Sequence, residues 1–190
     1  MPARGRHPRH FCAVVRFPKG TAIQEIPAQR RTPDGVDVLR EAAHRDVLIV
    51  AVGSFAKLGL EIAERLAHQG IGATVVDPRW IVPVPHSVVE LAGTHRLVVT
   101  LEDGIRVGGI GTRIRQDMRA AGIDTGVDER GLPDEFLDHG SRDFILEQVG
   151  LTAQSIARDV TAQVLGQRLP VARPLPADDE RAITEAIELP

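Results

Sequence analysis

The feature that most constrains the fold is a strand, a helix and a second strand that follow one another early in the chain. VLIVAVG (47–53) is rich in β-branched residues at successive positions, as expected for a strand of a parallel sheet covered on both faces. Ser54 stands where a helix N-cap belongs, apolar residues recur at helical spacing over 58–66, and Gly70 supplies a stop. ATVVD (73–77) is the next strand, and such crossovers join parallel strands. An α/β protein is therefore predicted.

Further segments extend this pattern along the chain. The sequence predicts a short buried strand at 11–16, a short strand or turn at 36–39, a helix at 86–92, a strand at 96–102, a helix at 112–121, a weaker strand at 123–128, a turn at 131–134, and helices beginning near Ser141 and Thr152. The expected fold class is a three-layer, open, mostly parallel twisted sheet with helices on both faces.

The composition bounds the domain organisation. With 190 residues, of which 43% are hydrophobic, the chain can close one good core with a short remainder. One domain is expected over residues 11–165, preceded by a basic N-terminal extension over 1–10. Residues 166–190 are rich in proline and acidic side chains and offer little apolar area to offset their ordering entropy, so a flexible tail is expected there.

Several function classes are disfavoured by charge and spacing. A formal net charge of −3 argues against binding to nucleic acid. The longest apolar run, 47–52, is only strand-sized, and no apolar segment of a secretory signal follows the basic residues 1–10, so a cytoplasmic protein without membrane contact is expected. Cys12 is expected to be a small core residue. The histidines show neither HExxH nor HxH spacing, so no metal site is predicted.

Two arginines are candidates for binding a phosphate-bearing ligand. Arg16 and Arg79 each lie at or just after the carboxyl end of a predicted strand, where open α/β sheets bind ligands. A guanidinium group is planar, permanently charged and able to bind phosphate bidentately. The alternative for each arginine is an ordinary surface or ion-paired residue.

A second group of candidates follows the strand at 96–102. The glycine cluster at Gly108, Gly109 and Gly111 precedes a helix, so its N–H groups could hold an anion, or its glycines could serve a tight turn and close packing. Glu102 could line a cleft or form a solvated strand end, whereas its neighbour Asp103 must point to the opposite face. His139 could face a cleft or serve as a loop residue. No catalytic residue is predicted.

Several segments, in this order, resemble the C-terminal domain of the 1-deoxy-D-xylulose-5-phosphate synthase family, a transketolase-like group. They are VVRFPKG (14–20), DVLIVAVGS (46–54), GIGATVVDPRWIVPVP (70–85), LVVTLEDGIRVGGIGT (97–112), GLPDEFLDHGSR (131–142) and GLTAQSIARDV (150–160), and the match spans about residues 11–165. This sequence departs from the family pattern at Lys19, where arginine is frequent, and at Asp103, where glutamate is common. It also has VPVP at 82–85, without the aspartate that would cap the next helix. Losing such a cap would cost about 1 kcal/mol.

The resemblance implies a chemistry that this sequence does not carry by itself. Enzymes of the family use thiamine diphosphate and magnesium to decarboxylate pyruvate and join the two-carbon unit to glyceraldehyde 3-phosphate. The GDG-type magnesium motif and the activating glutamate lie in two other domains, and neither segment occurs in these 190 residues. No cofactor is therefore expected on this chain alone. By resemblance, Arg16 and Arg79 hold the substrate phosphate, while Glu102 and the 108–111 turn are structural parts facing the rest of the enzyme.

Three functions fit these expectations. The chain could be the C-terminal domain of a synthase, inactive alone, or the C-terminal subunit of a split enzyme whose partner chain carries the thiamine-diphosphate-binding and pyrimidine-binding domains. It could also be a non-catalytic assembly or anion-binding module, since fold alone does not decide function. A homodimer is an open alternative.

Overall fold

The computed structural model describes residues 25–166. The predictions for the extension 1–10, the strand 11–16, Arg16, Cys12 and Lys19, and the tail after residue 166 therefore lie outside the described residues. In chain order the elements are β1 (Arg30–Arg31), β2 (Asp37–Arg40), β3 (Val47–Ala51), the 3₁₀ turn η1 (Gly53–Phe55), α1 (Ala56–Ala67), β4 (Ala73–Asp77), α2 (His86–Gly93), β5 (Leu97–Ile105), α3 (Ile110–Ala120), β6 (Gly126–Leu132), α4 (Arg142–Gln148) and α5 (Ala153–Val164).

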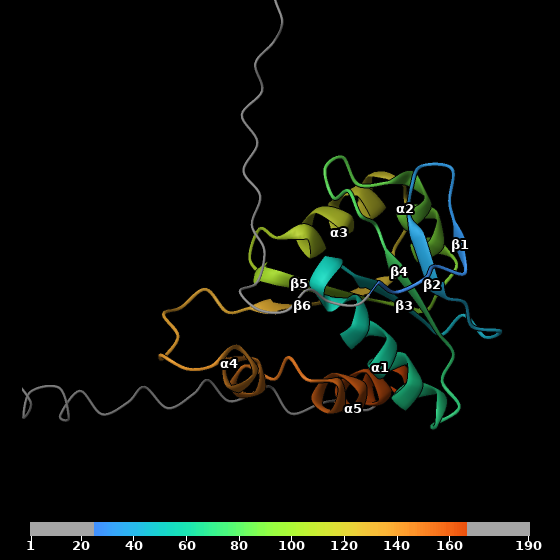
Figure 1. Ribbon diagram of the computed structural model, residues 1–190. Helices are drawn as coiled ribbons and strands as arrows, with labels where there is room; N and C mark the ends of the chain where they lie inside the picture. Colours follow the sequence, from blue (N-terminus) through green and yellow to red (C-terminus); the bar gives the residue numbers. More distant parts are fainter. Residues whose placement is uncertain (1–24, 167–190) are drawn as a thin grey trace, which may run out of the picture.

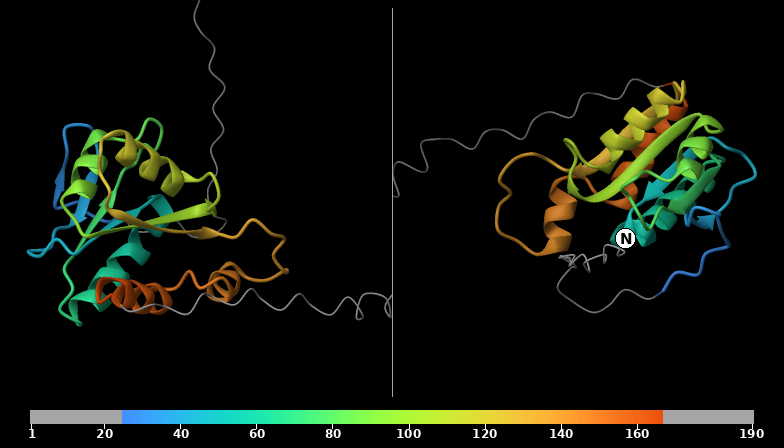
Figure 2. Two further views of the ribbon diagram at one scale, coloured as in Figure 1. Left: turned by 180° about the vertical axis from the view of Figure 1, so that it is seen from behind. Right: turned by 90° about the horizontal axis from the view of Figure 1, so that it is seen from above.

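The sheet confirms the predicted fold class. Its strand order is β1-β2-β4-β3-β5-β6. The four strands β4, β3, β5 and β6 run parallel, while β1 and β2 form an antiparallel hairpin on the edge next to β4. Helices α1, α4 and α5 lie on one side of the sheet and α2 and α3 on the other, which gives three layers (Figures 1 and 2).

The core consists of two apolar clusters that share the central strands. In β3, Val47, Ile49 and Ala51 belong to the cluster under α1 and α5, whereas Leu48 and Val50 belong to the cluster under α2 and α3. All five side chains are fully buried, because alternate strand residues point to opposite faces and helices cover both. The two-sided burial predicted for this segment is thus confirmed.

Helix starts show where local sequence patterns succeed and where they fail. Ser141 and Thr152 cap α4 and α5, accepting hydrogen bonds from the N–H groups of Phe144 and Ser155. The N-cap predicted at Ser54 is wrong, because residues 53–55 form a 3₁₀ turn and α1 begins at Ala56 without a side-chain cap. The Ser54 hydroxyl instead donates to Asp103 at 3.3 Å.

The end of β6 differs from the prediction. The expected turn at Gly131 and Leu132 is part of the strand, since Leu132 pairs with Ile105 at the end of β5. β6 therefore runs from Gly126 to Leu132 instead of ending near Asp128. The pairing partner, which is distant in sequence, decides where this weakly apolar strand ends.

The segment before β3 forms a β hairpin. Thr32-Pro33-Asp34-Gly35 makes the turn between β1 and β2, with Val36 N–H donating to Thr32 Oγ1 at 2.9 Å. Val36 and Val38 are fully buried against the α2 side of the core. The short strand that was one of two alternatives at 36–39 is observed as β2.

A buried histidine escaped the sequence analysis. His95, which follows α2, has one ring nitrogen 2.7 Å from the Leu91 carbonyl oxygen and the other 3.1 Å from the Thr74 hydroxyl. Burial lowers the pKa of His95, although the Leu91 hydrogen bond acts in the opposite direction. His95 is therefore a neutral packing residue of the described fold.

No helix within residues 25–166 is long and apolar enough to cross a membrane.

Candidate functional site

The carboxyl edge of the parallel strands carries the candidate residues. The chain leaves β3 through α1 to reach β4 on one side of it and leaves β5 through α3 to reach β6 on the other, so the topological switch point lies between β3 and β5. Open α/β sheets bind ligands in the crevice at such a point. The loop after β3 contributes Gly53 and Ser54, and the loop after β4 contributes Arg79.

Arg79 is fixed in its loop by its neighbours. It adopts a left-handed backbone conformation with φ of 58°, which costs a non-glycine residue about 1–2 kcal/mol. Its N–H donates to Asp77 Oδ1 at 2.9 Å, and the same oxygen accepts the Gly53 N–H at 3.4 Å. One carboxylate thus joins the loops after β3 and β4. The Arg79 side chain is about half exposed, and its Nε lies 3.7 Å from Asp37 Oδ2.

The Glu102 side chain in β5 is buried and caps α3, the helix that follows this strand. Its Oε2 accepts the Ile110 N–H at 3.0 Å and its Oε1 accepts the Gly111 N–H at 3.3 Å. Those N–H groups belong to the first turn of α3, where a carboxylate also meets the positive end of the helix dipole. Asp103, next in the strand, is exposed, as the alternation of side chains requires.

The glycines before and within α3 are explained by close packing. Gly108 has a φ of 74°, which favours glycine. A Cβ on Gly109 would overlap the Glu102 carboxylate, with the Cδ atom only 2.5 Å away. A Cβ on Gly111 would lie 2.8 Å from Glu129 Cγ. Because Glu102 already occupies the N–H groups of Ile110 and Gly111, these groups are not free to bind an external anion.

A hollow of about 470 Å³ joins this turn to the loop after β4. Ile81 and Val82 line it on one side, and Glu102, Gly108, Gly109 and α3 residues line it on the other. The loop that carries Arg79 therefore meets the glycine turn across the carboxyl edge. Val82 in this lining is 61% exposed, and Trp80 and Val107, which adjoin lining residues in sequence, are 76% and 66% exposed.

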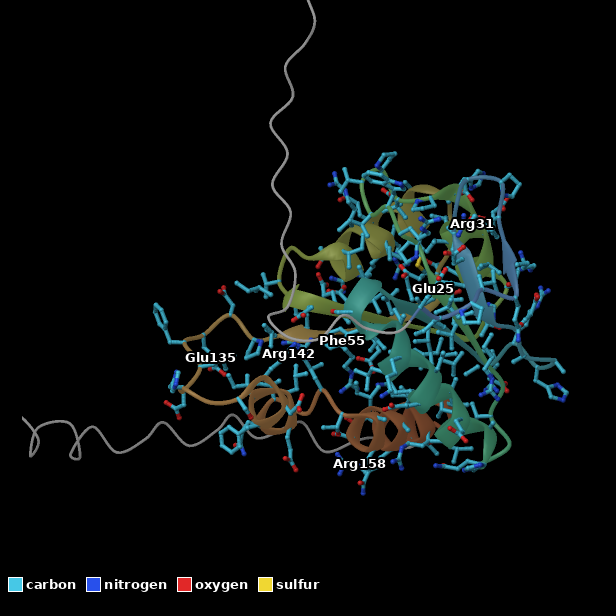
Figure 3. The ribbon with its side chains drawn as sticks, in the orientation of Figure 1. Glu25, Arg31, Phe55, Glu135, Arg142 and Arg158 are labelled. Carbon is cyan, nitrogen blue, oxygen red and sulfur yellow. The ribbon has the colours of Figure 1, made fainter. Side chains whose placement is uncertain are left out.

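A polar cluster ties α4 to the same edge. Arg142 donates to Asp103 Oδ2 at 2.8 Å, and its guanidinium lies 5.4 Å from the centre of the Phe55 ring. Figure 3 shows Arg142 and Phe55 side by side between α4 and the sheet. Asp103 also accepts the Ser54 hydroxyl, so this one carboxylate of β5 joins the loop after β3 to the start of α4.

The structure separates the remaining predicted residue from this group. His139 is exposed in the loop between β6 and α4. That loop also carries the fully exposed Phe136, and Glu135 marks its projecting part in Figure 3. Arg79, Glu102 and the glycine turn are thus neighbours on one edge, whereas His139 belongs to a loop outside the hollow.

Asp34 supplies the helix cap that the sequence analysis expected to be missing. Pro85 at the N-cap of α2 offers no side-chain acceptor, as predicted. However, Asp34 Oδ2 in the β1–β2 turn accepts the Ser87 N–H of α2 at 2.9 Å, and Oδ1 accepts the Ser87 hydroxyl at 2.5 Å. The expected loss of about 1 kcal/mol from an uncapped helix is therefore wrong.

This remote cap predicts a pH dependence of stability. Partial burial alone would raise the pKa of Asp34, but hydrogen bonds from Ser87 and Thr32 outweigh it and lower the pKa from 3.8 to about 2. The cap is complete above about pH 4 and is lost as the pH falls towards 2. We expect Asp34→Ala to lower the free energy of unfolding by about 1 kcal/mol at pH 7, and the deficit to shrink as the pH falls from 4 to 2.

Urea unfolding followed by far-UV circular dichroism at several pH values measures this deficit. Asp138→Ala, in the exposed loop before α4, is the control and should show no comparable deficit. A deficit for Asp34→Ala that stays constant down to pH 2 would contradict the assignment.

The described residues do not fit a thiamine diphosphate–magnesium group. No set of three or more histidine, cysteine or acidic side chains within residues 25–166 is placed to hold a metal ion. The glycine-rich helix start, which could have received a diphosphate, is bonded to Glu102. No catalytic step through that cofactor is therefore derived for this part of the chain.

The family "Transketolase, C-terminal domain" matches residues 35–156, a span that contains the central sheet, the switch point and the Arg79 loop. The chain belongs to this family.

The sequence is 74% identical over 168 residues to the 1-deoxy-D-xylulose-5-phosphate synthase of Clavibacter sepedonicus, covering 88% of this chain and 26% of that protein. It is 68% identical over 166 residues to the synthase of Leifsonia xyli subsp. xyli, covering 87% and 26%. The chain thus spans about a quarter of the length of these curated relatives and matches their C-terminal part.

A solved structure supports the same fold. A split-gene transketolase, described as an inactive beta4 tetramer, superimposes with a TM-score of 0.64 at 30% identity, covering 78% of this chain and 48% of that chain.

Proposed function

We propose that this chain is the C-terminal domain of a 1-deoxy-D-xylulose-5-phosphate synthase, in which it forms the substrate-phosphate side of the active site. The observation that carries the proposal is the 74% identity over 168 residues to a synthase. The site agrees with it, because Arg79 presents a half-exposed guanidinium at the carboxyl edge of the sheet, in the loop after the strand next to the switch point. The reaction would join a two-carbon unit from pyruvate to glyceraldehyde 3-phosphate in the cytoplasm.

The proposal divides the work between this domain and the rest of the enzyme. Arg16 and Arg79 would bind the phosphate of glyceraldehyde 3-phosphate through charge-assisted hydrogen bonds. Thiamine diphosphate and magnesium would be bound by the cofactor domains and would supply the carbanion chemistry when present. Because much of such catalysis comes from holding the reactants together, the 190-residue chain should be inactive without those domains.

Carbon dioxide release from pyruvate in the presence of glyceraldehyde 3-phosphate, thiamine diphosphate and magnesium tests this division. The chain alone should show no turnover. A chimaera in which it replaces the matching quarter of the Clavibacter synthase should be active. Turnover by the chain alone, or an unfolded or inactive chimaera, would count against the proposal.

The role of Arg79 gives a sharper prediction in the chimaera. We expect Arg79→Ala to raise the KM for glyceraldehyde 3-phosphate about tenfold, equivalent to about 1.4 kcal/mol, and Arg79→Lys to recover part of the loss. The KM for pyruvate should not change. Arg96→Ala is the control, because Arg96 is also exposed and ion-paired but lies at the opposite end of β5. Equal effects of both alanine variants would remove Arg79 from the phosphate site.

A split arrangement is the second candidate, and the tetrameric split-gene transketolase favours it. In either arrangement, we propose that the cofactor-bearing part of the enzyme covers the apolar rim of the carboxyl edge. The apolar rim consists of Trp80, Ile81, Val82, Ile105 and Val107. About three quarters of the relatives' length lies outside the match, and Ile81 and Val82 of the rim line the hollow beside the glycine turn. Exposed apolar clusters of this kind mark protein interfaces.

A further inference from the structure

The carboxylate of Asp37 lies between two guanidinium groups at the carboxyl edge. Arg31 binds it bidentately, with Nε 2.5 Å from Oδ1 and Nη2 3.1 Å from Oδ2. On the other side, Arg79 Nε lies 3.7 Å from Oδ2. The Asp37 side chain is only 15% exposed, whereas both arginine side chains are about half exposed. Of the three residues Arg31, Asp37 and Arg79, the aspartate is therefore the one held in a fixed position.

Strand register explains how these residues meet. Arg31 lies opposite Asp37 in the β1–β2 pair, and Asp37 lies opposite Asp77 at the end of β4, two residues before Arg79. Directly opposed residues of antiparallel strands carry their side chains on the same face. Figure 3 shows Arg31 on this edge hairpin. The hairpin thus delivers a carboxylate to the loop that carries Arg79.

The geometry suits an arginine that must bind an anion. A guanidinium has five N–H donors, and because the contact of Arg79 with Asp37 is an ion pair at Nε, 3.7 Å long and without a hydrogen bond, the donors of the two Nη groups remain for a ligand. A carboxylate beside a phosphate site would ordinarily repel the ligand. Here Arg31 neutralises Asp37, and the neighbouring Asp77 carboxylate accepts the backbone N–H groups of Arg79 and Gly53, so the Arg79 guanidinium is the charged group left to meet a ligand.

We propose that Asp37 is a positioning residue for the phosphate-binding guanidinium of Arg79, and that Arg31 holds Asp37 in place. This inference rests on the phosphate-binding role proposed for Arg79. Asp37 does not touch the ligand; it restricts the long Arg79 side chain to the orientation in which its Nη groups face the phosphate.

Titration of the 190-residue chain with inorganic phosphate and with glyceraldehyde 3-phosphate, followed by NMR, tests this role. Asp37→Asn should weaken both ligands about three- to tenfold, and the Arg79 Nε–H signal should lose its response to phosphate. Arg31→Gln, which leaves Asp37 in place but unclamped, should weaken them about two- to threefold. Asp46→Asn is the matched control, because Asp46 is a half-buried partner of Arg96 at the opposite edge. The Asp46→Asn variant should bind both ligands with wild-type affinity. Thermal unfolding checks that all variants are folded.

A double variant separates positioning from other effects. In an Arg79→Ala background, Asp37→Asn should cause no further loss, because the group that it positions is gone. Tighter phosphate binding by Asp37→Asn would show that Asp37 competes with the ligand and would overturn the inference. Unchanged binding by Asp37→Asn, with a clear loss for Arg79→Ala, would overturn the inference alone. A wild-type chain without phosphate affinity, or an Arg79→Ala variant with full affinity, would overturn the proposed phosphate site as well.

Discussion

Replacing Gly109 with alanine should lower the free energy of unfolding by about 3 kcal/mol. The new methyl group would overlap the Glu102 carboxylate, whose Cδ would be 2.5 Å from it. Glu102 cannot easily turn away, because it is buried and its Cγ already lies close to Gly131. Its displacement would leave the N–H groups of Ile110 and Gly111 without their acceptor, which costs about 1–3 kcal/mol, and the forced overlap adds overpacking strain of about 1–3 kcal/mol.

Urea unfolding followed by circular dichroism measures this loss, since the chain has no tyrosine and its single tryptophan, Trp80, is exposed. Gly104→Ala is the control, because a Cβ there would be 3.8 Å from its nearest neighbour and should cost less than about 0.5 kcal/mol. In a Glu102→Ala background, Gly109→Ala should add little, because the overlapping carboxylate is gone. A Gly109→Ala variant as stable as Gly104→Ala would show that Glu102 does not hold α3.

The layers of the fold were predictable because their signals are local. The composition of the β-branched run at 47–53 and of the segment at 73–77 predicts strands that are buried on both faces, and both strands occur where expected. Ser141 and Thr152 cap helices that begin one residue later, so local spacing was sufficient for them too. The position of Arg79 just beyond a strand end follows directly from the end of β4 at Asp77.

The parts that failed depend on partners far along the chain. Ser54 does not cap α1 because residues 53–55 form a 3₁₀ turn, and its hydroxyl instead donates to Asp103, 49 residues away. Asp34 caps α2 from 53 residues away, although the Thr-Pro-Asp-Gly sequence predicts only a turn. Asp37 reaches Arg79 only because two strand pairs align. Such contacts are set by the sheet register, which a single sequence does not specify.

These long-range contacts share one physical theme. Asp34, Asp37, Asp77 and Asp103 each bind at least one group that is distant in sequence, and Glu102 joins β5 to the start of α3. Carboxylates accept several hydrogen bonds at once, so one carboxylate can join two segments. The carboxyl edge is consequently preorganised without a ligand, and the half-exposed Arg79 and the apolar rim are the groups there that we propose for binding.

Placing charges on the apolar rim should weaken association with the cofactor-bearing part of the enzyme at least about 100-fold. Val82 and Val107 are 61% and 66% exposed, so Val82→Asp and Val107→Asp should not disturb the core. If a partner covers them, each carboxylate must lose its water without gaining a counter-ion, and a total cost of about 2.8 kcal/mol already corresponds to a 100-fold loss.

The unmatched three quarters of the Clavibacter synthase, produced as a separate chain, serves as the partner. Added in increasing amounts to the wild-type chain, it should restore turnover with a saturable dependence, and sedimentation should show the complex. Leu165→Asp is the matched control, since Leu165 is 63% exposed but follows α5 on the other face of the sheet. The double valine variant should need far more partner for the same turnover, whereas Leu165→Asp should behave as wild type. Equal losses in both would mean that added charge acts generally, and no loss in either would place the interface elsewhere than the carboxyl edge.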